Sequence, residues 1–184
     1  MDPITRKHLD NLQSEDANLR YEAFSSIISI THQPVDWAYE VWDDLLAQLQ
    51  NKNNHQRAIA AQVLCNLAKS DPGNRMLKDL DKIMEVTWDE RFVTARHTLQ
   101  SLWKIAAVGK KLQTMVVERL VNRYHDCIKE KNCTLIRFDI IQSFRRLYDQ
   151  VNDKEVKEKA LELIQLENDP KYQKKYEGLW KDAN

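Results

Sequence analysis

The chain has 184 residues, with 28 lysines and arginines against 28 aspartates and glutamates, and only 3 glycines and 4 prolines. This is the length of one ordinary domain with a core of its own, so folding requires neither a disulfide framework nor a structural metal. Scarce glycine and proline disfavour turn-rich β folds and disordered linkers, and zero net charge argues against bulk nucleic acid or an anionic membrane as the main partner.

Apolar residues recur at helical spacing along almost the whole chain, and only short stretches interrupt them. Two of these interruptions, Asp71-Pro72 and Asp169-Pro170, place a capping residue before a proline, which predicts that a helix starts at each. Gly109 is expected in the left-handed position after a helix end. The pattern predicts about ten helices, over residues 4–13, 19–31, 36–50, 53–69, 72–87, 89–109, 111–129, 133–150, 154–167 and from 170 onward.

Short connections make successive helices antiparallel, so the chain is predicted to be a row of helical hairpins. The second helix of each hairpin repeats one pattern at positions 0, +3, +7 and +10, and successive sets are displaced by 37, 38 and 42 residues. This displacement is typical of a two-helix solenoid unit. The four sets are Arg20, Ala23, Ile27 and Ile30; Arg57, Ala60, Leu64 and Leu67; Ala95, Thr98, Leu102 and Ile105; and Arg137, Ile140, Phe144 and Leu147.

The stretch Asp16–Ala23 reads DANLRYEA and resembles the inner helix of the HEAT and armadillo-like repeat family. Gln56-Arg57 with Ala60, and Ile136-Arg137 with Ile140, match that pattern in part, whereas Ala95 replaces the arginine in the third set. The resemblance implies a right-handed superhelix with the second helices on the concave side, where such proteins bind other macromolecules.

The expected fold is therefore all-α, a right-handed α-α superhelix (HEAT-like solenoid) of about four helical hairpins plus a C-terminal capping helix pair. It would form a single domain over residues 1–184, with repeats at about 4–32, 36–70, 72–108 and 111–150 and the cap at 153–181. Terminal repeats need such caps because their outer faces meet water. The helical spacing of Tyr172, Tyr176 and Trp180 predicts a face that packs back on the array.

Helical spacing also predicts core positions for Trp37, Trp42 and Trp103, and leaves Trp88 as the least explained tryptophan. An alternative function for exposed aromatics is the holding of damaged DNA, as in HEAT-like DNA glycosylases. Stacking on bases would require a dense basic groove between the aromatics, and the neutral net charge argues against one.

Catalysis and metal chemistry have little support in the sequence. His125, Cys127 and Cys133 lie near one helix connection, but a closed zinc site requires a fourth ligand. No histidine precedes a glutamate, which excludes a resemblance to the HEAT-like di-iron hydroxylases, and no GxSxG, GxGxxG or Walker-type loop is present. We expect no cofactor and no metal. An odd number of cysteines without a CxxC pair is expected where thiols stay reduced, as in the cytoplasm.

The polar faces of the second helices are the candidate binding surface. Position +5 carries Ser25, Gln62, Gln100 and Gln142, and position +9 carries Ser29, Asn66, Lys104 and Arg146. Residues 1–50 have a net charge of −6 and residues 51–148 one of +8, so this surface becomes basic toward the C-terminal repeats. The candidate partner-binding residues are His97, Gln100, Lys104, Gln142, Arg145 and Arg146. The simpler interpretation is a solvated helix face without a partner.

The sequence thus favours a cytoplasmic, non-catalytic module that binds a protein or peptide, for which an acidic segment would suit the basic surface. The first alternative is a DNA-binding or DNA glycosylase-type enzyme, for which binding would fall steeply with salt. The second is a self-associating structural protein. No membrane partner is expected, because the longest uncharged run, residues 24–35, is shorter than the ~20 residues that span a bilayer.

Overall fold

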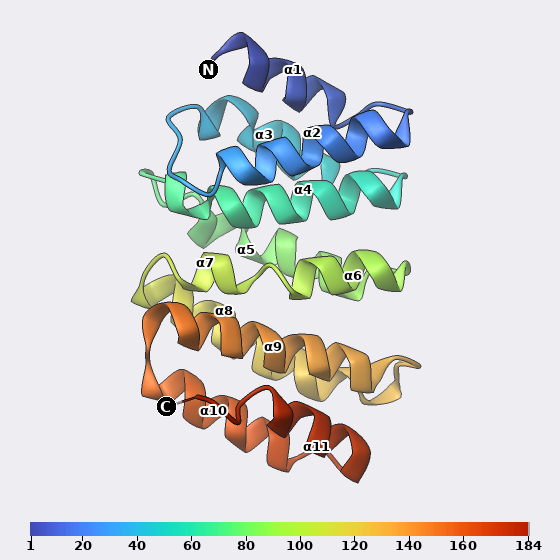
Figure 1. The fold of residues 1–184 in the computed structure, drawn as a ribbon, viewed down its shortest axis with the longest axis vertical. Coiled ribbons are helices and arrows are strands. Elements are labelled where there is room, and N and C mark those ends of the chain that lie inside the picture. The colour runs from blue at the N-terminus through green and yellow to red at the C-terminus, as the bar shows by residue number, and fades with distance from the viewer. Residues whose placement is uncertain (184) are drawn as a thin grey trace. The chain divides into compact units, whose positions relative to one another are not determined.

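The computed structural model describes residues 1–183, and every regular element within them is a helix (Figure 1). This confirms the predicted all-α class. The chain divides into two compact units, unit 1 from Met1 to Thr98 and unit 2 from Leu99 onward. The single domain over residues 1–184 and the right-handed superhelix remain predictions.

Unit 1 is built from helical hairpins. Helix α1 packs against α2, α3 packs against α4, and α2 lies beside α4 (Figure 1). The last helix of the unit ends at the boundary with unit 2. The elements are α1 (Pro3–Asn11), α2 (Ala17–Ile30), α3 (Ala38–Gln48), α4 (Asn54–Leu67), α5 (Met76–Glu85) and α6 (Phe92–Leu99), with 3-10 turns η1 (Ala68–Ser70) and η2 (Val86–Trp88).

Unit 2 is organised around its longest helix, α9 (Cys133–Val151). This helix contacts α7, α8, α10 and α11, which explains why one side of it is apolar along its whole length. The other elements are α7 (Trp103–Ala106), α8 (Lys110–Asp126), the 3-10 turn η3 (Cys127–Lys129), α10 (Lys154–Gln165) and α11 (Pro170–Gly178).

Side-chain caps start several helices. The Asp16 carboxylate accepts hydrogen bonds from the N–H groups of Asn18 and Leu19, and Asn53 accepts one from His55. Asp169 accepts one from Lys171, so the predicted start at Asp169-Pro170 is confirmed. These bonds satisfy N–H groups that have no partner within the helix.

The second predicted start, at Asp71-Pro72, is wrong. Helix α5 begins at Met76, because Gly73 and Asn74 form a turn in which Asn74 takes the left-handed conformation, with φ of 55°. Asp71 still caps the helix from outside it, since its carboxylate accepts from the N–H groups of Arg75 and Met76 at 2.9 and 2.8 Å.

Two expectations for residues 89–109 also fail. The predicted single helix breaks into α6 and α7, and the carbonyl of Gln100 at the break accepts a hydrogen bond from Arg146 at 3.1 Å. The N–H of Lys104 turns to the carbonyl of Ser101 instead, which is a tighter turn than an α-helix. Gly109 is extended, with φ of 175°, and not left-handed.

Burial supports the repeat pattern. Positions +3 and +7 are buried in all four sets, as are three of the four residues at +10, and Ile30 is half-buried. The third set follows the same pattern although a helix break interrupts it, because Ala95, Thr98, Leu102 and Ile105 are all buried. The pattern therefore marks the side of each second helix that faces the core.

The aromatic residues lie largely where helical spacing predicts them. Trp37 and Trp42 are buried, and the indole N–H of Trp42 donates to Asp79 at 3.1 Å. Trp103 is half-buried and Trp88 is 48% exposed. The cap packs back on the array as predicted, because Tyr176 and Trp180 are buried beside Phe138 and Tyr148 of α9 while Tyr172 is half-buried.

Candidate functional site

The arginines at position 0 anchor the second helices, which carry the candidate site. Arg20 donates to the carbonyl of Ser14, and Arg57 donates to that of Asn51 in the equivalent connection. Each guanidinium thus joins the start of a second helix to the connection that precedes it. Arg57 reaches Asp89 as well, and Arg137 reaches Glu167 at 3.1 Å. These hydrogen bonds and ion pairs hold the first turns of the second helices in place.

A groove runs over the first turns of the second helices in unit 1. It has a volume of about 330 Å³ and receives residues from α2, α4 and α6. Helices α2 and α4 lie side by side there (Figure 1). The lining residues are Ala17, Arg20, Tyr21, Phe24, His55, Ala58, Ile59, Gln62 and His97.

The groove combines apolar surface with basic and polar groups. Tyr21 is 72% exposed, and Phe24 and Ile59 are half-buried in the same lining. Arg20, His55 and His97 supply positive charge or N–H donors, and no acidic side chain lines the groove. The lining comes from residues 17–24 and 55–62 together with His97, so the fold joins segments from both sides of residue 50 into one surface without an acidic side chain.

The predicted binding residues are divided between the two units. His97 lies in unit 1 and lines the groove, whereas the other five belong to unit 2. Gln100 donates to Asp139 at 2.8 Å, and Arg146 donates to the carbonyl of Gln100. These two hydrogen bonds join the turn before α7 to α9.

The remaining three candidates have different surroundings. Arg145 donates to Asp149 and to the carbonyl of Leu179, each at 2.8 Å, and its guanidinium lies 5.8 Å from the centre of the Trp180 ring. It therefore fastens the C-terminal cap to α9. Lys104 is half-buried beside the ring of Trp103, and Gln142 is half-buried on α9.

The polar row at position +9 is also interrupted in unit 1. Asn66 is buried and donates to the carbonyl of Ile28 and to the hydroxyl of Thr31, at 3.2 and 3.0 Å. The prediction of a continuous, solvent-facing ridge is wrong at this position, because Asn66 satisfies the end of the neighbouring helix α2.

Tyr21, Phe24 and His55 are not among the residues predicted from the sequence. In the frame of the repeat they occupy positions +1, +4 and −2, near the starts of the second helices, whereas the predicted polar rows occupy positions +5 and +9. The available signal was Tyr21, a large apolar ring placed off the buried positions of its helix. Such a ring has no place in the core of its own repeat.

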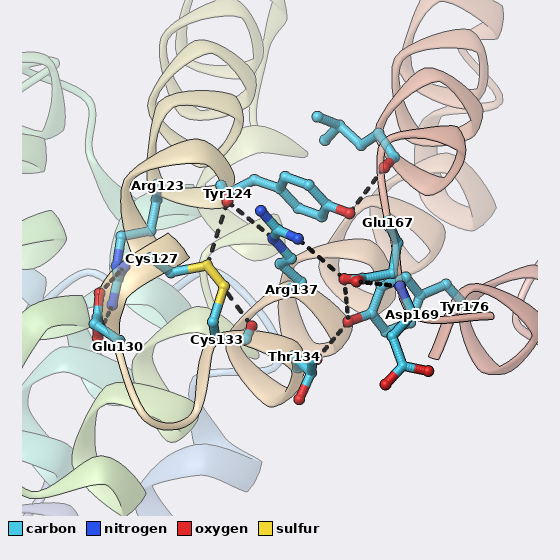
Figure 2. The surroundings of a disulfide bond; sticks show 11 residues. Arg123, Tyr124, Cys127, Glu130, Cys133, Thr134, Arg137, Glu167, Asp169 and Tyr176 are labelled. Atoms are coloured by element: carbon cyan, nitrogen blue, oxygen red, sulfur yellow. Dashed lines mark hydrogen bonds and ion pairs between the residues drawn. A yellow bond between two sulfur atoms is a disulfide. The ribbon is translucent and has the colours of Figure 1, made fainter. Parts of the chain in front are cut away.

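The connection between α8 and α9 contains a disulfide, which joins Cys127 to Cys133 (Figure 2). The expectation that all three cysteines remain thiols is wrong for this pair, while Cys65 is a buried thiol. The two cysteines do not have CxxC spacing, so the sequence does not predict the bond. The η3 turn brings them to a Cα–Cα distance of 5.1 Å. Oxidised sulfurs cannot serve as thiolate ligands, and residues 1–183 contain no group of three His, Cys, Asp or Glu side chains placed to hold a metal.

A buried polar network lies beside the disulfide (Figure 2). Arg137 bonds Glu167 and lies 4.5 Å from the centre of the Tyr124 ring, and the Tyr176 hydroxyl donates to the carbonyl of Thr134 at 2.6 Å. Burial raises the pKa of Tyr124 to about 12 and raises the pKa of Tyr176 further above its usual value. Both phenols stay protonated near neutral pH, so they act as hydrogen-bond donors that join helices and not as catalytic bases.

No protein-family model matches this chain, and comparison with curated protein sequences finds no match. Over residues 1–183, none of the helices is both long and apolar enough to cross a membrane.

Proposed function

We propose that the protein is a non-catalytic interaction module that binds a protein or peptide segment along its second helices. The groove of unit 1 carries this proposal, because it offers exposed aromatic surface and basic groups with no acidic side chain in its lining. The proposal includes the HEAT-like, right-handed superhelix, which the shared burial of positions +3 and +7 supports. A cytoplasmic location remains an expectation from the sequence.

The groove chemistry selects an acidic segment with a neighbouring apolar side chain. A carboxylate can form charge-assisted hydrogen bonds with Arg20, and with either histidine in its protonated form. The apolar side chain can cover Phe24 and Ile59, which are half-buried and therefore expose apolar surface to water in the absence of a partner. Tyr21 is the expected centre of the interface, because tyrosine contributes large contact area at a low entropic cost.

A peptide-display experiment tests this function. Random 12-residue peptides are selected on the full chain, and an enriched peptide is labelled and titrated by fluorescence anisotropy. We expect enriched peptides to contain acidic residues beside an apolar one. Tyr21→Ala should weaken binding at least tenfold, because it removes the exposed ring. The matched control is Ile4→Ala, which trims a similarly exposed side chain on α1, outside the groove.

Two results would count against the proposal. One is a set of enriched peptides without acidic residues; the other is equal binding by the wild type and Tyr21→Ala. The DNA-binding alternative is tested with labelled single-stranded and double-stranded 20-nucleotide probes. Tight binding that falls steeply between 50 and 200 mM salt would favour that alternative.

A further inference from the structure

A second groove lies in unit 2, between α8 and α10. Its volume is about 550 Å³. Its walls are one face of α8 and one face of α10, because the lining residues on each helix are spaced mostly three or four apart. The lining residues are Lys110, Gln113, Thr114, Val117, Glu118, Val121, Asn122, Glu155, Val156, Glu158, Lys159 and Glu162.

The length of this groove matches a short helix. The α8 wall runs from Lys110 to Asn122, which at a rise of ~1.5 Å per residue corresponds to about 18 Å. A partner helix of about 12 residues has the same length. Val117, Val121 and Val156 supply the apolar part of the lining, and the first two are half-buried, so they are open to a partner side chain.

The charge along the groove is negative. Its lining contains four glutamates and two lysines. Lys110 contacts Asp153 and Glu155, at 2.8 and 2.7 Å, and Lys159 pairs with Glu162, so both cations are already compensated. Within residues 1–183, Glu118 and Glu158 have no ion pair, and both are exposed. They stand on opposite walls, one on α8 and one on α10.

From the valine lining and the uncompensated glutamates on both walls, we infer that this groove binds a basic amphipathic helix of a partner protein. The apolar stripe of that helix covers Val117 and Val121, and flanking lysines or arginines reach Glu118 and Glu158. This is helix-in-groove recognition, in which apolar residues at i, i+3, i+4 and i+7 anchor the partner and charge sets its orientation.

The test uses a synthetic 14-residue peptide with leucines at helical spacing and lysines on the remaining faces. A second peptide carries glutamate in place of every lysine. Each is titrated against the full chain by fluorescence anisotropy. We expect the lysine peptide to bind in the micromolar range and the glutamate peptide to bind at least tenfold more weakly.

Paired variants separate the groove from general charge attraction. The double variant Glu118→Lys/Glu158→Lys should weaken the lysine peptide at least tenfold. The control Glu177→Lys/Asp182→Lys changes the net charge equally at exposed positions outside the groove and should alter binding less than twofold. If circular dichroism shows that the groove variant does not fold, Glu118→Gln/Glu158→Gln replaces it, with an expected loss of at least threefold.

Three outcomes would overturn the inference. They are absence of binding by the lysine peptide at 1 mM, equal losses in the groove and control variants, and self-association of the chain that the groove variant abolishes. The last outcome would identify a second copy as the occupant. None of these results affects the groove of unit 1, which is tested with different peptides and different variants.

Discussion

Arg57 and Asp89 form a bidentate ion pair in unit 1, with Nε–Oδ2 and Nη2–Oδ1 distances of 2.5 and 2.8 Å. Burial acts to raise the pKa of Asp89, but hydrogen bonds from the Arg57 side chain and the Arg91 N–H outweigh it and lower that pKa. A carboxyl whose pKa falls on folding stabilises the protein above its unfolded value of about 3.9. This contribution is lost as the pH falls through the lower folded value.

Arg57→Ala should lower the free energy of unfolding by about 3 kcal/mol at pH 7, because it leaves the Asp89 carboxylate buried without its cation. The side chain of Asp89 is only 4% exposed, so water cannot compensate fully. Urea unfolding from pH 7 to pH 3 measures the effect. The difference from the wild type should shrink toward the acid end, because protonation of Asp89 removes the stabilisation that the ion pair provides.

The control for this prediction is Arg91→Ala, in which the neighbouring exposed arginine is removed. It should change stability by less than about 0.5 kcal/mol, as surface substitutions do. Equal effects of the two substitutions, or a difference that grows toward pH 3, would show that the buried ion pair does not have this role.

At the scale of elements, the connection between α8 and α9 is held from two sides. The disulfide Cys127–Cys133 closes a short loop, and the fully buried side chain of Arg123 bonds Glu130 within the same loop, with an Nη1–Oε1 distance of 2.6 Å (Figure 2). A cross-link of this kind acts mainly by restricting the unfolded chain.

Alkylation of the unfolded, unreduced chain should label one cysteine, Cys65, and alkylation after reduction should label three. Reduction should lower the free energy of unfolding by about 2 kcal/mol, the size expected for a loop this short. The double variant Cys127→Ser/Cys133→Ser should show no response to the reductant. Three labelled cysteines before reduction would mean that the bond is absent in the protein as prepared.

At the scale of the whole molecule, one residue pattern serves both compact units. Leu64 of unit 1 and Leu102 of unit 2 occupy the same position, +7, in different repeats, and both are fully buried. Because each set buries its +3 and +7 side chains, each unit forms its core from the same faces of its second helices. The repeat pattern therefore predicts the buried side chains of the second helices in both units.

Leu64→Ala and Leu102→Ala should each cost about 2 to 5 kcal/mol, through lost burial and the cavity that remains. Leu166→Ala is the control, because Leu166 is 51% exposed and its loss should cost less than about 0.5 kcal/mol. Denaturant unfolding of the three variants provides the measurement. Costs for Leu64 or Leu102 as small as that of Leu166 would show that the repeat frame is wrong.

Sequence reasoning succeeded where the signal is local. Asn53 and Asp169 cap their helices because a cap needs only the next two or three N–H groups. It failed at Asp71, where a local motif for a helix start competes with the turn at Gly73. That turn is held from outside, because the Gly73 N–H donates to the hydroxyl of Tyr39 on α3 at 2.7 Å.

The sequence by itself determined the helical class, most helix positions and the buried faces of the second helices, because periodicity and capping act within one or two helical turns. Only the tertiary structure decided the break at Gln100, whose carbonyl accepts a hydrogen bond from Arg146, and the groove that brings Tyr21 near His55 and His97. It also decided the pairing of Cys127 with Cys133. These features depend on how distant segments meet and on the path of one connection, and no local residue pattern encodes either.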